Sequence, residues 1–172
     1  MAAPAGLGDR VTPVTPVRRL VPLVVVPLLV LAAVLLLTAL EPLRVSSQSM
    51  RPTLEAGDQV LVDKLSVHWR PPAEGELIVF RDPERHELVV KRVVARSGRT
   101  VAIEDAVLVV DGTPRREPQV DLSRIDSTYF GPVTVPPDAV FVLGDNRSES
   151  IDSRTYGAVP LEDVVGRVVL TF

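Results

Sequence analysis

Hydrophobic and polar residues divide the chain into two parts with different patterns. Residues 20–40 form an apolar run without a charged side chain. Beyond residue 54, short apolar runs rich in valine alternate with turn residues such as Gly, Asp and Pro. The first pattern predicts one long apolar helix, and the second predicts strands rather than helices.

The candidate strands are short and closely spaced. A strong hairpin signal, Asp111-Gly112, follows one of them, and only residues 160–164 favour a single helical turn. We expect a mostly β domain, with its strands in a partly closed β-barrel. The expected strands are residues 59–62, 76–80, 87–95, 100–103, 106–110, 133–135, 139–143 and 164–172.

The apolar run is long enough to span a membrane. A helix of this length extends about 31 Å, which matches a hydrocarbon core of about 30 Å. The alternative, a cleaved signal peptide, has an apolar region of about 7–15 residues and small residues at the cut. Here the run ends in Thr38-Ala39-Leu40-Glu41-Pro42, without Ala-x-Ala at its boundary. We therefore expect residues 20–40 to be a retained transmembrane anchor.

Flanking charges predict the orientation of this anchor. Arg18 and Arg19 precede the run and Glu41 follows it, which favours a cytoplasmic N-terminus. Residues 1–19 are then a disordered cytoplasmic tail, and residues 41–172 are an extracytoplasmic domain of the cell membrane. The net charge is −3, and residues 1–40 carry +2, so the domain carries −5. An acidic domain argues against nucleic acid as a partner.

The scarcity of metal-binding and nucleophilic side chains narrows the possible chemistry. The chain has no cysteine, which excludes disulfides, thiolate metal sites and a cysteine nucleophile. Its two histidines, His68 and His86, lie far apart in the sequence and do not have metal-ligand spacing. We therefore expect neither a metal nor a cofactor.

Ser49 is the first candidate catalytic residue, nine positions beyond the apolar run in Ser47-Gln48-Ser49-Met50-Arg51-Pro52-Thr53-Leu54. A serine hydroxyl needs a base to become a nucleophile. One alternative is a histidine from a Ser-His-Asp triad. However, His68 and His86 lie in segments without an accompanying pattern.

Lys91 is the other candidate base, in an otherwise apolar stretch, Leu88–Val94. Alternation places Val89, Lys91 and Val93 on one face of the predicted strand. If that face is interior, burial lowers the pKa of the lysine and lets it act as a base. Arginine could not, because it stays protonated in proteins. The alternative is an edge strand with Lys91 and Arg92 in solvent.

A dense polar loop, Gly144–Arg154, follows the predicted strand 139–143. Its side chains could be solvated and satisfy turn backbone. They could also form a braced network that points into a site.

Four blocks in this order resemble the bacterial type I signal peptidases, membrane-anchored serine proteases that remove signal peptides from exported proteins. They are SxSMxPTL at Ser47–Leu54, GDxVLVxK at Gly57–Lys64, KRVV from Lys91, and GDNRxxSxDSR at Gly144–Arg154. Together with the apolar run, they cover essentially the whole chain. The resemblance implies the family's mostly β fold, which shares its core with the repressor-type Ser-Lys autoproteases.

The resemblance also implies roles for individual residues. Ser49 resembles the nucleophile and Lys91 the general base, while the Ser47 hydroxyl and the Ser49 N–H resemble the oxyanion hole. Ser150 resembles the hydroxyl that orients the lysine, and Asp152 and Arg154 resemble the groups that support the site. The substrates would be exported preproteins with small residues at the first and third positions before the cut (−1 and −3). Val89 and Val90, beside the base, would form pocket walls.

One departure and two rival functions accompany this interpretation. The family's lysine block usually continues with glycine and a Pro-Gly-Asp turn, whereas here it reads Ala95-Arg96-Ser97-Gly98-Arg99. The first rival is a non-catalytic membrane-tethered peptide-binding or assembly module, which should have lost Ser49 or Lys91. The second is a self-cleaving regulatory protease, which should carry a DNA-binding segment or a scissile linker where this chain has its apolar run.

Overall fold

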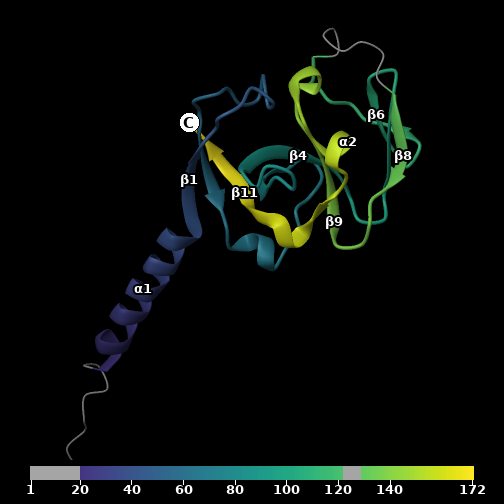
Figure 1. The fold of residues 1–172 in the computed structure, drawn as a ribbon. Coiled ribbons are helices and arrows are strands. Elements are labelled where there is room, and N and C mark those ends of the chain that lie inside the picture. The colour runs from purple at the N-terminus through teal and green to yellow at the C-terminus, as the bar shows by residue number, and fades with distance from the viewer. Residues whose placement is uncertain (1–19, 122–128) are drawn as a thin grey trace, which may run out of the picture. The chain divides into compact units, whose positions relative to one another are not determined.

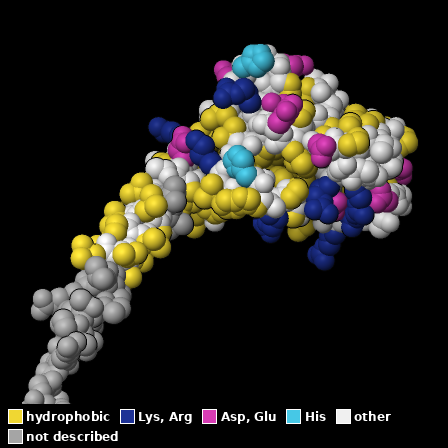
Figure 2. All heavy atoms as spheres, turned by 90° about the horizontal axis from the view of Figure 1, so that it is seen from below, with side chains coloured by type: hydrophobic (Ala, Val, Ile, Leu, Met, Phe, Trp, Pro, Cys, Tyr) yellow, Lys and Arg dark blue, Asp and Glu magenta, His cyan; other side chains and the backbone are white. Residues whose placement is uncertain are grey.

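The computed structural model describes residues 20–121 and 129–172. It divides into two units, residues 1–36 and 37–172, and each is considered by itself. The helix α1 (Leu20–Ala39) covers the apolar run, and its side chains between residues 22 and 34 are exposed and mostly hydrophobic (Figure 2). Among the described residues, no helix combines the length and apolar character needed to cross a membrane. The expected tail, residues 1–19, lies outside the described residues.

From residue 40 onward the described residues form a mostly β structure (Figure 1), as the sequence predicts. The strands are β1 (Leu40–Arg44), β2 (Gln59–Asp63), β3 (Leu77–Arg81), β4 (Leu88–Arg96), β5 (Thr100–Glu104), β6 (Val107–Val110), β7 (Thr113–Pro114), β8 (Phe130–Thr134), β9 (Ala139–Leu143), β10 (Val159–Pro160) and β11 (Val164–Thr171). The helical elements are α2 (Ser153–Tyr156) and the 3₁₀ turns η2 (Ser66–His68), η4 (Arg147–Glu149) and η5 (Leu161–Asp163).

The strands belong to two antiparallel sheets. The larger has the order β1-β2-β11-β3-β4-β9-β10 and curls into a half-barrel, which confirms the expected partly closed barrel. The smaller has the order β7-β6-β5-β8. The hairpin expected at Asp111-Gly112 joins β6 to β7, and both turn residues have positive φ angles, 51° and 70°, as a two-residue hairpin of type I′ requires.

All the expected strands are present, but β1, β7, β10 and α2 were not predicted from the sequence. β1 begins at Leu40, where the apolar run ends, and pairs along its length with β2. Pro42 disfavours helix for the residues before it. The N–H of Lys64 accordingly binds the carbonyl of Ala39 as the helix ends.

β4 lies inside the larger sheet, between β3 and β9. Lys91 is 4% exposed, so the alternative of an edge strand with both basic residues in solvent is wrong. β9 pairs only with Arg92 to Arg96, however, so the segment Leu88–Lys91 has a strand neighbour on one side only. The unusual turn after β4 closes normally, because Gly98 takes a positive φ of 81° and its N–H binds the carbonyl of Val135.

The segment after Ser49 is anchored by apolar packing. Met50 and Leu54 are each 1% exposed and pack with β2, Val79 and Val90 in one core cluster. Their backbones also meet, since the Leu54 N–H binds the Met50 carbonyl at 3.0 Å. This packing fixes the turn that carries Ser49 against the strand that carries Lys91.

Candidate active site

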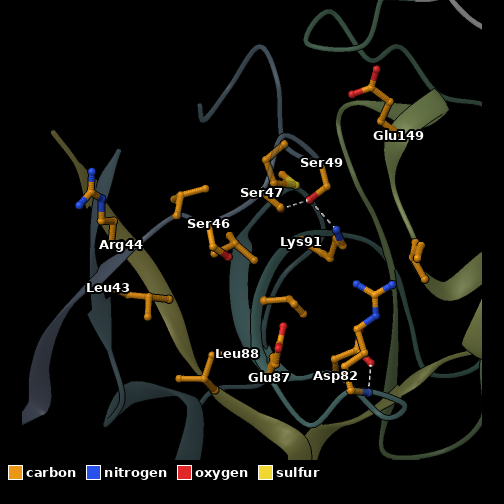
Figure 3. Close-up of a pocket in the computed structure, with 16 residues that line it drawn as sticks. Leu43, Arg44, Ser46, Ser47, Ser49, Asp82, Glu87, Leu88, Lys91 and Glu149 are labelled. Carbon is orange, nitrogen blue, oxygen red and sulfur yellow. Dashed lines mark hydrogen bonds between the residues drawn. The ribbon is translucent and has the colours of Figure 1, made fainter. Parts of the chain in front are cut away.

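Ser49 and Lys91 meet although 42 residues separate them. Lys91 Nζ donates a hydrogen bond to Ser49 Oγ at 2.6 Å (Figure 3). The two residues are 6% and 4% exposed. Ser49 comes from the loop after β1 and Lys91 from β4. A serine hydroxyl in contact with a buried amine is the arrangement that a Ser-Lys nucleophile and base requires.

Burial lowers the pKa of Lys91 from its ordinary value to about 8, because an apolar surrounding disfavours the charged amine. The carboxylates of Asp152, Asp82 and Asp145 oppose this shift, while Arg154 adds to it. The amine is consequently neutral in a substantial fraction of molecules near neutral and mildly alkaline pH. A neutral amine can accept the proton of a hydroxyl.

Ser47 lies beside the nucleophile. Its Oγ is 3.1 Å from Ser49 Oγ, and both face the same cleft (Figure 3). A hydroxyl here can donate to an oxyanion that forms on a carbonyl attacked by Ser49.

Asp152 and Arg154 form an ion pair within the polar loop. Asp152 is fully buried and accepts hydrogen bonds from Arg154 Nε at 2.8 Å and from the Gly144 N–H at 3.0 Å. It also caps the start of α2 by accepting the Arg154 N–H. The Arg154 guanidinium reaches the carbonyls of Arg147 and Ser150. The polar loop is therefore a braced network rather than a solvated loop.

Ser150 packs closely against the backbone near the nucleophile. A Cβ added at Gly144 would lie 2.2 Å from Ser150 Oγ and 2.5 Å from the Ser49 carbonyl. Ser150 Oγ is buried and makes no hydrogen bond among the described residues. The structure thus places this hydroxyl beside the dyad without a bond to Lys91.

A second network joins the polar loop to the blocks that carry Ser49 and Lys91. Asp145 is 2% exposed and accepts two hydrogen bonds from the Arg92 guanidinium, at 2.8 and 2.6 Å. The Thr53 hydroxyl donates to the same carboxylate, and the Asn146 N–H binds the Ser49 carbonyl at 3.0 Å. The turn with Ser49 is thus linked through side chains to the strand with Lys91.

The dyad opens into a cleft of about 160 Å³. Apolar side chains of Val45, Met50, Val89, Val90 and Ile151 form part of its wall. The two predicted pocket residues, Val89 and Val90, therefore do lie beside the dyad. Charged residues at its margin are Arg44, Asp82, Arg85, Glu87 and Glu149.

Comparison with known proteins identifies the family. The family model described as "Signal peptidase, peptidase S26" matches residues 17–172. The chain belongs to this family. Among curated relatives, it is 36% identical over 170 residues to "Probable signal peptidase I-1" of Synechocystis sp., covering 91% of this chain and 82% of the relative. It is 34% identical over 198 residues to "Signal peptidase I" of Mycobacterium tuberculosis, covering 82% and 67%.

A solved structure gives the same result. The crystal structure of a signal peptidase I from Enterococcus faecalis is similar with a TM-score of 0.52 and 29% identity, covering 58% of this chain and 98% of that one. As a member of the signal peptidase family, the chain is a serine endopeptidase that removes signal peptides from preproteins. Family membership favours this interpretation over a non-catalytic binding module.

Neither His68 nor His86 belongs to the site formed by Ser49 and Lys91. His68 Nδ1 contacts the carbonyl of Leu65, and His86 lies in the turn between β3 and β4. In the described part of the chain, no three acidic or histidine side chains gather where they could hold a metal.

Sequence reasoning missed Asp82 and the Arg92–Asp145–Thr53 network. Asp82 follows β3, is 5% exposed and lines the cleft of the dyad. Its Asp-Pro sequence indicates only a turn. The partner of Arg92 could not be found from strand alternation, because the bond joins residues 53 positions apart.

Proposed function

We propose that Ser49 is the nucleophile and Lys91 the general base of this signal peptidase. The observation that carries the proposal is the 2.6 Å contact between two buried side chains, one of them a lysine with a pKa lowered to about 8. The reaction class is acyl transfer to serine followed by hydrolysis.

The chemistry follows from these positions. When Lys91 is neutral, Ser49 Oγ–H donates its proton to Nζ and the oxygen attacks the scissile carbonyl carbon. The Ser49 N–H and the Ser47 hydroxyl stabilise the resulting oxyanion. The carbon–nitrogen bond then breaks, and the protonated Lys91 gives its proton to the leaving amine. Lys91 next takes a proton from the water that attacks the acyl-enzyme carbonyl, and it returns this proton to Ser49 Oγ as the carbon–oxygen bond to Ser49 breaks.

Three residues of the polar loop would prepare the base. The buried Ser150 hydroxyl has no hydrogen-bond partner within residues 20–121 and 129–172, so it is available to orient the Lys91 amine. Asp152 and Arg154 hold the loop that carries this hydroxyl through their ion pair and its backbone contacts. Their role is positional, because neither is hydrogen-bonded to Ser49 or Lys91.

The preprotein would bind as an added strand. One wall of the cleft is the segment Leu88–Lys91, whose side away from β3 has no paired strand. The opposite wall continues from β1, which lies at the edge of its sheet. Shallow pockets beside Val89 and Val90 would accept small side chains at the first and third positions before the cut.

The proposed setting is a lipid bilayer, crossed once by residues 20–40. The uncharged run of 21 residues supports this anchor, and a helix that is apolar on all sides needs apolar surroundings. Arg18 and Arg19 before the run favour a cytoplasmic N-terminus. The catalytic domain would then act at the outer face of the cell membrane on exported preproteins.

The test compares wild-type, Ser49→Ala and Lys91→Ala proteins, each full-length in detergent, on a preprotein with an Ala-x-Ala site. Cleavage after that site is expected from wild type alone, with each variant reduced at least a thousandfold. Lys64→Ala is the matched control, because Lys64 is the only other lysine and pairs with Glu41 at an exposed position. Cleavage that survives Lys91→Ala would show that another group is the base.

A further inference from the structure

One carboxylate in the cleft of the dyad has no assigned role. Glu87 is exposed and lines the same cleft as Ser49 and Lys91. Figure 3 shows its carboxylate directed into the cleft, on the side of Leu88 and Asp82. Within the described residues, this carboxylate makes no side-chain hydrogen bond and no ion pair. It is thus free to meet a substrate.

Glu87 shares a strand face with the catalytic lysine. Side chains alternate along a strand, so Lys91, Val89 and Glu87, two residues apart, share one face. Every residue from Glu87 to Lys91 lines the cleft. Glu87 precedes β4 but continues its extended pairing, because its carbonyl accepts the Asp82 N–H at 2.8 Å. At about 3.3 Å per residue, Glu87 lies about 13 Å along the strand from Lys91.

A bound preprotein strand would follow the same spacing. Directly opposed residues of paired strands place their side chains on the same face. If the preprotein strand runs parallel to β4, with the −1 residue at Lys91 and the −3 residue at Val89, the −5 residue lies at Glu87. Building on the proposed function, we infer that Glu87 is a specificity-determining residue that favours lysine or arginine at position −5 of the signal peptide.

The other charges at this end of the cleft leave a net negative balance. Asp82 stands directly beside Glu87 across the turn, and its Oδ1 accepts the backbone N–H groups of Glu84 and Arg85. The turn from Arg81 to Glu87 holds three carboxylates (Asp82, Glu84 and Glu87) and two cations, Arg81 and Arg85. The Arg81 guanidinium binds the carbonyl of His86. On the opposite wall, Figure 3 shows the Arg44 guanidinium directed away from Lys91 and Glu87.

The expected preference is modest because Glu87 is solvent-exposed. Pairs of exposed charges contribute little to binding and are weakened by salt. Replacing an attracted lysine by a repelled glutamate at position −5 should change kcat/KM by about fivefold at low ionic strength. The change should shrink toward unity at high salt.

The experiment uses the full chain in detergent and three peptides that share one Ala-x-Ala site but carry Lys, Gln or Glu at position −5. The ratio of kcat/KM for the Lys peptide to that for the Glu peptide is measured at about 20 mM and 500 mM salt. Wild type should favour the Lys peptide about fivefold at low salt. Glu87→Gln should bring the ratio close to one, and Glu87→Lys should invert it. Glu104→Gln, at an exposed position on the smaller sheet, is the matched control and should keep the wild-type ratio.

Arg85→Gln removes a positive charge near Glu87 and should therefore increase the preference for the Lys peptide. A wild-type ratio near one, or a ratio that Glu87→Gln leaves unchanged, would overturn the inference while leaving the proposed function intact. If wild type cleaves none of the three peptides, the proposed function fails and this inference falls with it.

Discussion

Lys91 stands in an apolar strand where an aliphatic side chain would pack without a desolvation cost. The sequence predicts both its strand and its chemistry, because lysine is rare in this chain and arginine cannot deprotonate. What the sequence could not predict is the charge around it. Asp82 and Asp145 influence its pKa from segments that are distant or separated by a turn. Such neighbours emerge only when the strands are placed side by side.

The lowered pKa predicts how activity depends on pH. Protonated Lys91 cannot accept the serine proton, so kcat/KM should rise about tenfold per pH unit below pH 8 and level off above it. With a pKa of about 8, about one tenth of the molecules carry the neutral amine at pH 7. A pH–rate profile on a peptide without titratable groups measures this. A profile flat between pH 5 and 9 would contradict Lys91 as the base.

At the scale of elements, the sequence predicts most of the strands but only part of the segments that connect them. Valine-rich runs with turn residues between them predict β2 to β6, β8, β9 and β11. β1 was hidden because its residues follow directly on the apolar run, and its partner is β2, about twenty residues later. For the polar loop 144–154 the sequence left two alternatives open, a solvated loop or a braced network, and it did not predict the short helix α2, which depends on the Asp152 cap.

At Gly144, the first residue of the polar loop, we expect that even an added methyl group is not tolerated. Gly144→Ala would place Cβ 2.2 Å from Ser150 Oγ and 2.5 Å from the backbone carbonyl of Ser49. Because the second contact is with backbone, the nucleophile turn must shift. We expect kcat to fall about a hundredfold or more, since small misplacements of reacting groups have such effects.

The measurement is peptide cleavage by purified Gly144→Ala protein, with circular dichroism to check its fold. Gly75→Ala is the control, because Gly75 has a positive φ of 90° but nothing within 4 Å of an added Cβ. It introduces backbone strain without a clash at the site. Equal losses in both variants would mean that general destabilisation, rather than the contact with Ser49, reduces activity.

At the scale of the whole molecule, the active site draws on segments from most of the chain. Ser49, Lys91 and the polar loop are held together by one apolar cluster and two ion-pair networks. The order of the four sequence blocks predicted this convergence through a family resemblance. Periodicity alone would have given a β domain with an isolated lysine. The buried amine of Lys91 lowers the stability of the surrounding fold when it is protonated.

Replacing the base should therefore stabilise the protein. The folded-state pKa of Lys91, about 8, lies below its ordinary value of 10.5, so between these pH values the unfolded chain binds more protons. Stability should rise with pH through this window, and below pH 8 the buried charge should cost the folded state about 1–3 kcal/mol. Lys91→Met removes that cost in a side chain of similar length. We expect its free energy of unfolding to exceed that of wild type by this amount at pH 6.5, and the difference to vanish near pH 10.5.

Denaturant unfolding of both proteins in the same detergent, at pH 6.5 and pH 10, measures the difference. Lys64→Met is the control, because the Lys64 side chain is 42% exposed and its ion pair with Glu41 lies at the surface. It should change stability little at either pH. A gain for Lys91→Met that is equal at both pH values would mean that better packing, rather than removal of a buried charge, is responsible. A pH-dependent gain accompanied by complete loss of cleavage would show that the amine needed for catalysis is maintained at the expense of stability.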